Sequence, residues 1–351
     1  MMTPADNFFM LRALELAASG AGYTSPNPLV GCVIVHNNEI IGEGWHQSYG
    51  GPHAEVNAVN AVKDKKLLSQ STVYVTLEPC SHFGKTPPCV DLLVKHAVKK
   101  VIICNNDPNP LVAGRGIAKL REAGIEVESN FLAEKGSILN RRFFTFHQQK
   151  RPYIVLKWAQ TSDGFIAKEN YEPAAISGAI SKNLVHKWRT EEAAILVGTN
   201  TAQFDNPKLN IREWSGKNPI RLVIDKNLNL PSELHLFDRN QKTIVFNLKR
   251  TEFLHDNLEF VRLDPESDFL SQLLYHLHQR QIQSVLVEGG TFLLNSFIKN
   301  NLWDEARILR SLKQFSAGIS APDLPLNSLT ENFCIDQDQL FIHRNNFFFN
   351  N

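Results

Sequence analysis

The sequence predicts an α/β protein built from two domains, and three observations support that prediction. The chain has 351 residues, which is more than one typical domain contains. Short apolar runs alternate with helical segments in both halves, as in sheets whose faces are covered by helices. A polar, basic run at 148–151 leads to Pro152, where a new strand begins. We therefore expect domains at residues 1–147 and 148–351.

The composition argues against several functional classes. Apolar residues make up 43% of the chain, and 37 basic residues balance 36 acidic ones to a formal net charge of +1. That balance does not indicate a nucleic-acid partner. The N-terminus lacks the basic start of a signal peptide, and no apolar run is long enough to predict a membrane span. Five cysteines, an odd number, argue against a disulfide framework, so we expect a cytoplasmic protein.

The first half begins with a helix, because apolar residues recur at helical spacing between Phe8 and Ala18. Two strands joined by a His-Asn-Asn turn are expected within 31–46. The remaining elements are a helix at 53–62, a strand within 71–80, a strand within 98–108 that ends in a polar loop, and a helix and a strand within 116–129. This alternation favours an α/β sandwich with a partly parallel sheet.

Four strand-like runs stand out in the second half, at 153–159, 193–198, 220–225 and 284–290. Each ends in a turn or a polar residue, and ligands of such sheets usually bind at the carboxyl ends of the strands. The last run leads through Gly289 and Gly290 into a helix. The two glycines would let backbone N–H groups approach a phosphate, although such a pair also suits a strand-to-helix turn that binds nothing.

Two short segments hold residues with the chemistry of a zinc site. GPHAEV at 51–56 contains His53 and Glu55, and VTLEPCSHFGKTPPC at 75–89 contains Cys80 and Cys89. One imidazole and two thiolates suit a catalytic zinc with an open fourth position, where a water reaches a pKa of roughly 7. Glu55 is then placed to carry a proton from that water to a departing amine.

The start of a helix decides whether these residues can meet. His53 and Glu55 are two positions apart and would not share one face of a helix, so they converge only at its beginning, which Pro52 marks. The eight residues between the cysteines exceed the two of the usual zinc deaminase pattern. Two alternatives remain: a structural zinc with His82 as fourth ligand, or buried thiols without a metal.

Several motifs of the first half resemble one enzyme family. PNPLVGC at 26–32, HAE at 53–55, the insert SHFGKTPP between the cysteines and DPNPLVAGRG at 107–116 are similar to the deaminase half of the bifunctional riboflavin-biosynthesis deaminase/reductases. The resemblance implies a cytidine-deaminase-like α/β/α sandwich and makes Asn27 a candidate substrate contact. The alternative is that Asn27, which lies between two prolines, only organises its turn.

The second half resembles the reductase half of the same family through TSDG at 161–164, the segment 186–212 and VEGG at 287–290. The resemblance implies a dihydrofolate-reductase-like fold and NADPH as cofactor. By position it assigns the substrate side to Lys157, Arg189, Leu209, Arg212 and Glu288, and the cofactor side to Thr201, Asp205, Gly289 and Gly290. Arg189 and Arg212 suit a phosphate clamp, and the alternative for either is a solvated surface charge.

One departure from the family pattern concerns the cofactor side. Where the family commonly has Trp-Ile-Ser or Trp-Ile-Thr, this chain has Ala175-Ile176-Ser177, so the aromatic ring expected beside the cofactor is missing. Trp158 or Phe204 could partly compensate for it. The departure supports an alternative in which the second half only binds or dimerises.

The resemblance implies two successive reactions on one small molecule. The first is zinc-dependent hydrolysis of the 2-amino group of 2,5-diamino-6-ribosylamino-4(3H)-pyrimidinone 5′-phosphate. The second is NADPH-dependent reduction of its ribosyl group to ribityl. We expect a homo-oligomer with no nucleic-acid or membrane partner. A nucleic-acid or free-nucleoside deaminase is the alternative from another substrate class, and the near-neutral charge argues against it.

Overall fold

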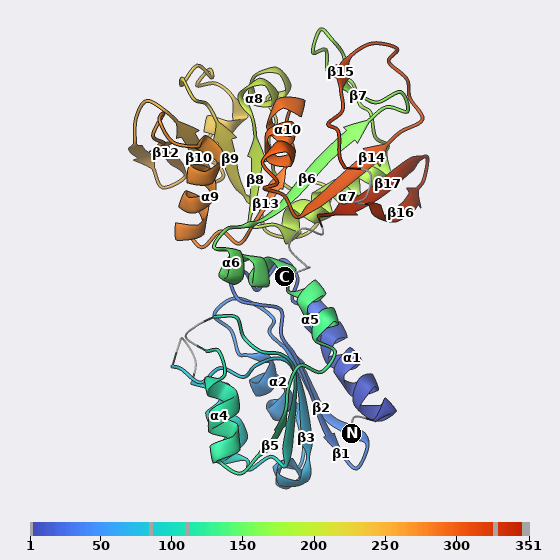
Figure 1. Ribbon diagram of the computed structural model, residues 1–351, viewed down its shortest axis with the longest axis vertical. Helices are drawn as coiled ribbons and strands as arrows, with labels where there is room; N and C mark the ends of the chain where they lie inside the picture. The colour runs from blue at the N-terminus through green and yellow to red at the C-terminus, as the bar shows by residue number, and fades with distance from the viewer. Residues whose placement is uncertain (1–2, 84–86, 110–111, 326–328, 346–351) are drawn as a thin grey trace. The chain divides into compact units, whose positions relative to one another are not determined.

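Figure 1 shows the computed structural model, which describes residues 3–83, 87–109, 112–325 and 329–345. The chain forms two compact units, residues 1–150 and 151–351. Unit 1 ends just after helix α6 (Arg141–Gln149), and the expected boundary at 147/148 falls inside that helix. Across the described residues, none of the helices combines the length and the apolar character needed to cross a membrane.

Unit 1 is built on a five-stranded sheet in the order β2-β1-β3-β4-β5. Its strands are β1 (Gly31–His36), β2 (Glu39–Trp45), β3 (Thr72–Leu77), β4 (Lys100–Asn105) and β5 (Glu126–Glu128). Strand β1 pairs antiparallel with β2 and β3, whereas β3, β4 and β5 run parallel. The prediction of a partly parallel sheet is therefore confirmed.

Helices cover both faces of this sheet. They are α1 (Pro4–Ala18), α2 (Ala54–Ala61), α3 (Cys89–Lys95), α4 (Arg115–Glu122), α5 (Ala133–Leu139) and α6, with a 3₁₀ helix at Lys65–Gln70. Alternate residues of β1 enter two different cores, because successive side chains of a strand point to opposite faces. Val33 and Val35 pack with α1, while Cys32 and Ile34 pack with α2 and α3. This arrangement is the predicted α/β/α sandwich.

Helix α2 is held very close to strand β2. A Cβ on Gly42 would lie 2.5 Å from the Ala58 carbonyl oxygen, and one on Gly44 would lie 2.4 Å from the Ala58 nitrogen. Only glycine permits such an approach, so these two positions determine where α2 lies on the sheet. The start of α2 carries His53 and Glu55, and the close packing therefore positions both.

Unit 2 contains a ten-stranded sheet in the order β11-β12-β10-β9-β8-β13-β6-β14-β17-β16, and a separate pair, β7 with β15. The strands are β6 (Tyr153–Gln160), β7 (Phe165–Ala167), β8 (Ala194–Val197), β9 (Ile220–Ile224), β10 (Thr243–Asn247), β11 (Glu252–His255), β12 (Leu258–Arg262), β13 (Ser284–Val287), β14 (Glu305–Arg310), β15 (Ile319–Ser320), β16 (Leu329–Ile335) and β17 (Asp338–Arg344). From β12 to β14 the neighbours run parallel, and β11, β17 and β16 add antiparallel edges. The four predicted runs are confirmed as β6, β8, β9 and β13.

Helices also lie on both faces of the unit 2 sheet. They are α7 (Ala179–Glu191), α8 (Thr199–Asp205), α9 (Phe269–Gln279) and α10 (Thr291–Lys299), with a 3₁₀ helix at His235–Phe237. Ile154 and Leu156 of β6 enter the core that contains α9 and α10, and Tyr153 and Val155 enter the core beneath α7. Because β8, β13 and β6 are parallel neighbours, residues that follow them meet at one edge of the sheet.

Candidate functional site

Unit 1 brings three potential metal ligands together. The ligand atoms of His53, Cys80 and Cys89 all lie within 4.8 Å of one another. His53 Nδ1 is 3.2 Å from Cys89 Sγ and 3.5 Å from Cys80 Sγ. In a tetrahedral zinc site, bond lengths of 2.0–2.3 Å place neighbouring donor atoms roughly 3.5 Å apart. The three side chains therefore fit zinc as they stand.

Two helix starts deliver these ligands. His53 is the N-cap of α2 and follows Pro52, and Cys89 is the first residue of α3 and follows Pro88. The backbone N–H of Cys89 donates to Cys80 Sγ over 3.3 Å. A hydrogen bond with the Cys89 thiol lowers the pKa of Cys80, which favours the thiolate that a metal needs.

Glu55, the second residue of α2, lies beside the ligands. Its side chain is buried, and the residue is 3% exposed. Burial raises the pKa of Glu55, the nearby Cys80 thiolate raises it further, and His53 acts in the opposite sense. A carboxyl group with a raised pKa can donate a proton as well as accept one, which suits general acid–base chemistry.

The segment between the cysteines bears on the structural-zinc alternative. His82 is exposed, and within the described residues it does not belong to the ligand group. Residues 84–86 of the insert lie outside the described part of the chain, as do residues 110–111 of the 107–116 motif. Three protein donors leave a fourth position for water or substrate, as in catalytic zinc sites.

A chain of hydrogen bonds connects Asn27 to the ligand segment through His46. Asn27 Nδ2 lies 3.0 Å from His46 Nε2, and His46 Nδ1 lies 3.0 Å from the Pro52 carbonyl oxygen. The His46 and His53 rings meet edge to face with centroids 5.4 Å apart. The Asn27 N–H donates to the Thr24 carbonyl over 2.8 Å, so Asn27 organises its turn while its side chain contacts His46.

Sequence reasoning missed three buried polar residues near the ligands: His46, Glu78 and Asp107. Burial raises the pKa of Asp107 to about 6, and the charges of Glu78 and Cys80 contribute to the increase. A hydrogen bond from the Asn109 N–H acts in the opposite sense and lowers this pKa. Position along the chain is the signal that was available. Each of the three follows the end of a strand by one or two residues, where α/β proteins commonly place functional groups.

Unit 2 assembles a buried cluster of charges from β6, α7 and the end of β13. Arg189 makes two hydrogen bonds to Glu288, from Nε to Oε1 at 2.9 Å and from Nη2 to Oε2 at 2.8 Å. Lys157 Nζ lies 3.9 Å from the same carboxylate. Burial alone would raise the pKa of Glu288, but the charges of Arg189 and Lys157 lower it to about 2. Burial lowers the pKa of Lys157.

The Arg189 guanidinium differs from the expected phosphate clamp. Its two-donor edge is taken up by Glu288, and Nη1 donates to the Asn210 carbonyl oxygen over 3.1 Å. The side chain is 12% exposed, so it is not a solvated surface charge either. Arg212 is exposed, and its Nη1 donates to Asn210 Oδ1 over 2.6 Å. A phosphate that approaches this region would meet Arg212 first.

The loop 209–212 brings Leu209 and Arg212 next to this cluster. Leu209 is buried and has a left-handed φ of 50°. The backbone N–H of Arg212 donates to His186 Nδ1 over 3.2 Å. Burial, with the positive charges of Arg189 and Arg212, lowers the pKa of His186. A neutral His186, one turn before Arg189 on α7, therefore holds the loop, and nothing in the sequence indicated this role.

The expected cofactor-side residues fall into two groups. A Cβ on Gly289 would lie 3.0 Å from Thr201 Oγ1, and one on Gly290 would lie 3.4 Å from it, so these three residues are in contact. Gly290 has a φ of 60°, which suits a residue without a side chain. Asp205 is exposed at the end of α8, one turn beyond Thr201. Asp205 therefore lies on the same face of α8 as Thr201.

The ring missing at Ala175 is not supplied by Trp158, which is 4% exposed and belongs to the apolar core. Phe204 is different, because it is 46% exposed and lies three residues after Thr201 on α8. It stacks on Tyr171 with ring centroids 4.3 Å apart and planes at 12°. This pair presents an aromatic surface on the helix that carries Thr201.

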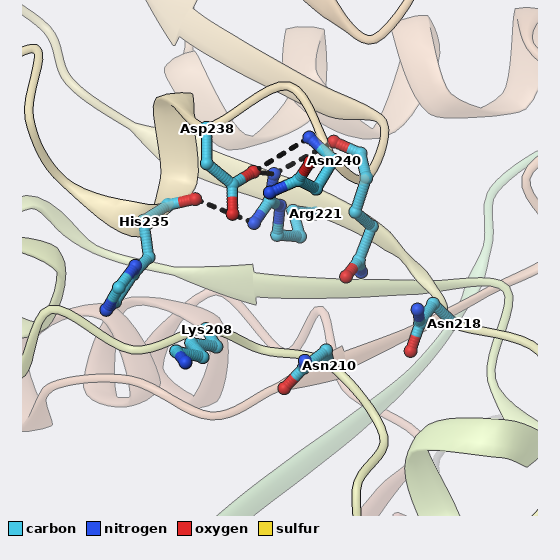
Figure 2. Close-up of a pocket in the computed structure, with 8 residues that line it drawn as sticks. Lys208, Asn210, Asn218, Arg221, His235, Asp238 and Asn240 are labelled. Carbon is cyan, nitrogen blue, oxygen red and sulfur yellow. Dashed lines mark hydrogen bonds and ion pairs between the residues drawn. The ribbon is translucent and has the colours of Figure 1, made fainter.

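A cavity of about 340 Å³ lies beside the loop 209–212 of unit 2 (Figure 2). It is lined by Lys208, Asn210, Asn218, Arg221, His235, Asp238, Asn240 and Gln241. Arg221 donates to Asp238 Oδ1 over 2.6 Å and to the His235 carbonyl oxygen over 2.8 Å, as the dashed lines in Figure 2 show. None of the residues expected at the substrate or cofactor sides lines this cavity.

Comparison with known proteins places both halves in one family. Residues 3–105 match the zinc-binding region of cytidine and deoxycytidylate deaminases, and residues 152–311 match the RibD C-terminal domain. The riboflavin biosynthesis protein RibD of Actinobacillus pleuropneumoniae is 44% identical over 310 residues, which are 86% of this chain and 82% of that protein. The chain belongs to the RibD family. RibD of Aquifex aeolicus is 39% identical over 335 residues, 94% of each chain.

Solved structures of RibD proteins share the fold. The diaminohydroxyphosphoribosylaminopyrimidine deaminase/5-amino-6-(5-phosphoribosylamino)uracil reductase of Thermotoga maritima has a TM-score of 0.87 at 36% identity, covering 96% of this chain and 97% of that chain. Acinetobacter baumannii RibD has a TM-score of 0.87 at 33% identity, covering 97% and 98%. Unit 1 is a cytidine-deaminase-like domain and unit 2 is a dihydrofolate-reductase-like RibD C-terminal domain. As a RibD protein, the chain is a bifunctional deaminase and reductase of riboflavin biosynthesis.

Proposed function

We propose that unit 1 hydrolyses the 2-amino group of 2,5-diamino-6-ribosylamino-4(3H)-pyrimidinone 5′-phosphate. His53, Cys80 and Cys89 would hold zinc, which supplies Lewis acidity toward water when it is bound. The convergence of these three donors within 4.8 Å is the observation that carries the proposal. It leaves room for one further ligand, as hydrolysis at a zinc site requires.

Glu55 moves the proton in the proposed deamination. Hydrolysis takes a proton from the attacking water and delivers one to the leaving ammonia, and one carboxyl group can do both in turn. Glu55 is buried beside Cys80, and its raised pKa brings donation within reach. Asn27, which contacts His46, has a side-chain amide available to orient the pyrimidine ring.

For unit 2 we propose reduction of the ribosyl group to ribityl. NADPH, when bound, supplies the hydride. Hydride addition at the sugar carbon leaves the departing ring oxygen in need of a proton, and Lys157 Nζ is the acid of the cluster, since burial lowers its pKa. Glu288 keeps Lys157 and Arg189 in place through its charge, and Arg212 is the exposed cation that suits the phosphate.

For the cofactor we propose a position along the first turn of α10 and the face of α8. Gly289 and Gly290 leave space for a close approach, and Thr201 lies against them. Asp205 continues this surface along α8. Phe204, stacked on Tyr171, would provide the aromatic ring that the family commonly takes from a tryptophan.

One assay tests both halves of the proposal. Purified protein is incubated with the diaminopyrimidine phosphate and NADPH, and ammonia release and NADPH absorbance are followed separately. Both signals are expected. Ammonia without NADPH oxidation would favour a second half that only binds or dimerises. Ammonia from nucleosides or RNA, with none from the pyrimidine phosphate, would favour the nucleoside deaminase alternative.

We also propose a cytoplasmic enzyme that forms a homo-oligomer. None of the five cysteines forms a disulfide, and Cys32 and Cys104, which are not proposed as metal ligands, are buried, which suits a reducing compartment. Light scattering on the purified protein tests the oligomer, and a mass equal to one chain would contradict it.

A further inference from the structure

Glu78 is a buried carboxylate two residues before the metal ligand Cys80. It follows the end of β3 and is 4% exposed. Its oxygens accept four backbone N–H groups, from Asp107 at 3.3 Å, Gly114 at 3.0 Å, Gly116 at 2.9 Å and Ile117 at 3.3 Å. Hydrogen bonds to an ionised acceptor are about twice as strong as neutral ones. Glu78 therefore ties the end of β3 firmly to Asp107 and to residues 114–117, the segment at the start of α4.

That segment lies directly against the turn that carries Cys80. A Cβ on Gly116 would lie 2.2 Å from the Pro79 carbonyl oxygen, so the backbones touch. On its other side the turn is held by α3, because the Val90 N–H donates to the Cys80 carbonyl oxygen over 3.2 Å. The Cys80 turn is thus clamped between two segments, and Glu78 supplies the polar contacts of one of them.

We propose that Glu78 is a positioning residue of the metal centre, which orients the Cys80 thiolate by anchoring its turn to Asp107 and to residues 114–117. This inference rests on the proposed zinc ligation by Cys80. Groups that orient a metal ligand without contacting the metal typically contribute about 10- to 100-fold to metal affinity. Glu78 does so through backbone amides and without touching the metal, the substrate or the reacting atoms.

The test is zinc affinity, measured by competition with a chromogenic chelator on the full chain. Glu78→Gln replaces one acceptor oxygen by an N–H₂ group that faces backbone donors, and we expect zinc to bind about 10- to 100-fold more weakly. Glu122→Gln, an exposed carboxylate on α4, is the matched control and should bind as wild type does. Cobalt substitution adds a spectroscopic readout, because a misplaced Cys80 would change the thiolate-to-cobalt absorption bands.

A purely structural role would lower the stability of Glu78→Gln and leave the zinc affinity and cobalt spectrum of the folded protein unchanged, and that result would overturn the proposal. If Glu78→Gln does not fold, Glu78→Asp keeps the charge and withdraws it by one methylene. Weaker zinc binding in that variant supports the proposal, and wild-type affinity overturns it. A wild-type chain that binds no zinc would refute the proposed function itself, which distinguishes the two failures.

Discussion

The candidate metal site of unit 1 and the charged cluster of unit 2 differ in whether side chains of the protein neutralise their negative charges. In unit 1, the hydrogen bond that lowers the pKa of Cys80 raises that of Cys89, so the pair does not hold two thiolates unaided. In unit 2, the negative charge of Glu288 is already balanced by Arg189 and Lys157. The first site therefore suits an added cation, whereas the carboxylate of the second is neutralised by cations of the chain itself. Two sites on one chain should respond to different perturbations.

Metal removal is expected to separate the two sites most strongly. Chelation should reduce ammonia release to background, because it removes the zinc that activates water. Cys80→Ser should do the same, because it removes one of the three protein donors. NADPH oxidation with the deaminated intermediate should stay within about twofold, since each site is built from residues of its own unit and independent sites do not couple. Both signals are measured on one sample, and zinc re-addition to the chelated enzyme is the control. Loss of both activities would contradict the independence of the sites.

Glu55→Gln separates proton transfer from zinc binding within unit 1. Deamination should fall by about 10²- to 10⁴-fold, because the amide cannot transfer the proton. Zinc content, measured by elemental analysis, should remain that of wild type. Glu39→Gln, an exposed carboxylate on β2, should leave both quantities unchanged. Full turnover in Glu55→Gln would remove Glu55 from its assigned role.

Glu288→Gln tests the claim that the unit 2 cluster is complete without a metal. The lowered pKa of about 2, against an ordinary 4.5, corresponds to about 3 kcal/mol of folding free energy, and the variant should lose roughly that amount. Urea unfolding with and without a chelator provides the measurement. Glu266→Gln, an exposed carboxylate of the same unit, is the control. A chelator-dependent loss would contradict the electrostatic explanation.

The stability difference between wild type and Glu288→Gln should also depend on pH, and this effect is smaller and graded. Because the folded pKa of Glu288 is depressed, its contribution is fully present above about pH 4.5 and is lost as the pH falls toward about 2. The difference in unfolding free energy between wild type and Glu288→Gln should therefore shrink over that window. A difference that stays constant from pH 6 to pH 3 would show that the carboxylate charge is not responsible.

Phe204→Ala should have the smallest effect. Loss of the ring stacked on Tyr171 is expected to raise the KM for NADPH by about fivefold, in keeping with about 1 kcal/mol for an aromatic pair. The kcat for reduction and the deamination rate should change little. Phe253→Ala on β11, which removes an exposed ring at the sheet edge, is the control. An unchanged KM in Phe204→Ala would mean that the cofactor does not use this ring.

Sequence patterns predicted the central elements of both sheets and missed several peripheral ones. The strands β6, β8, β9 and β13 are mostly apolar, since a parallel strand covered on both faces is largely buried, and Lys157 in β6 and Arg221 in β9 are the charged exceptions. The edge strands β11 and β16, and β17 beside β16, have mixed sequences, and no periodicity indicated them. The structural roles of Glu78 and His186 were missed because both accept hydrogen bonds from backbone N–H groups. Almost every residue has such a group, so the sequence does not indicate which ones will be the partners.

The sequence by itself determined the chemistry of the metal centre. Its residue types, the prolines before His53 and Cys89, and the acid two residues after His53 are local features of the sequence, and prolines favour helix starts at those two places. Only the tertiary structure decided the unit 2 site. Arg189 and Glu288 are 99 positions apart, and their pairing depends on which strands become neighbours in the sheet. That choice commits Arg189 to a carboxylate, because a buried charge must be neutralised inside the protein, and it leaves Arg212 exposed beside the cluster.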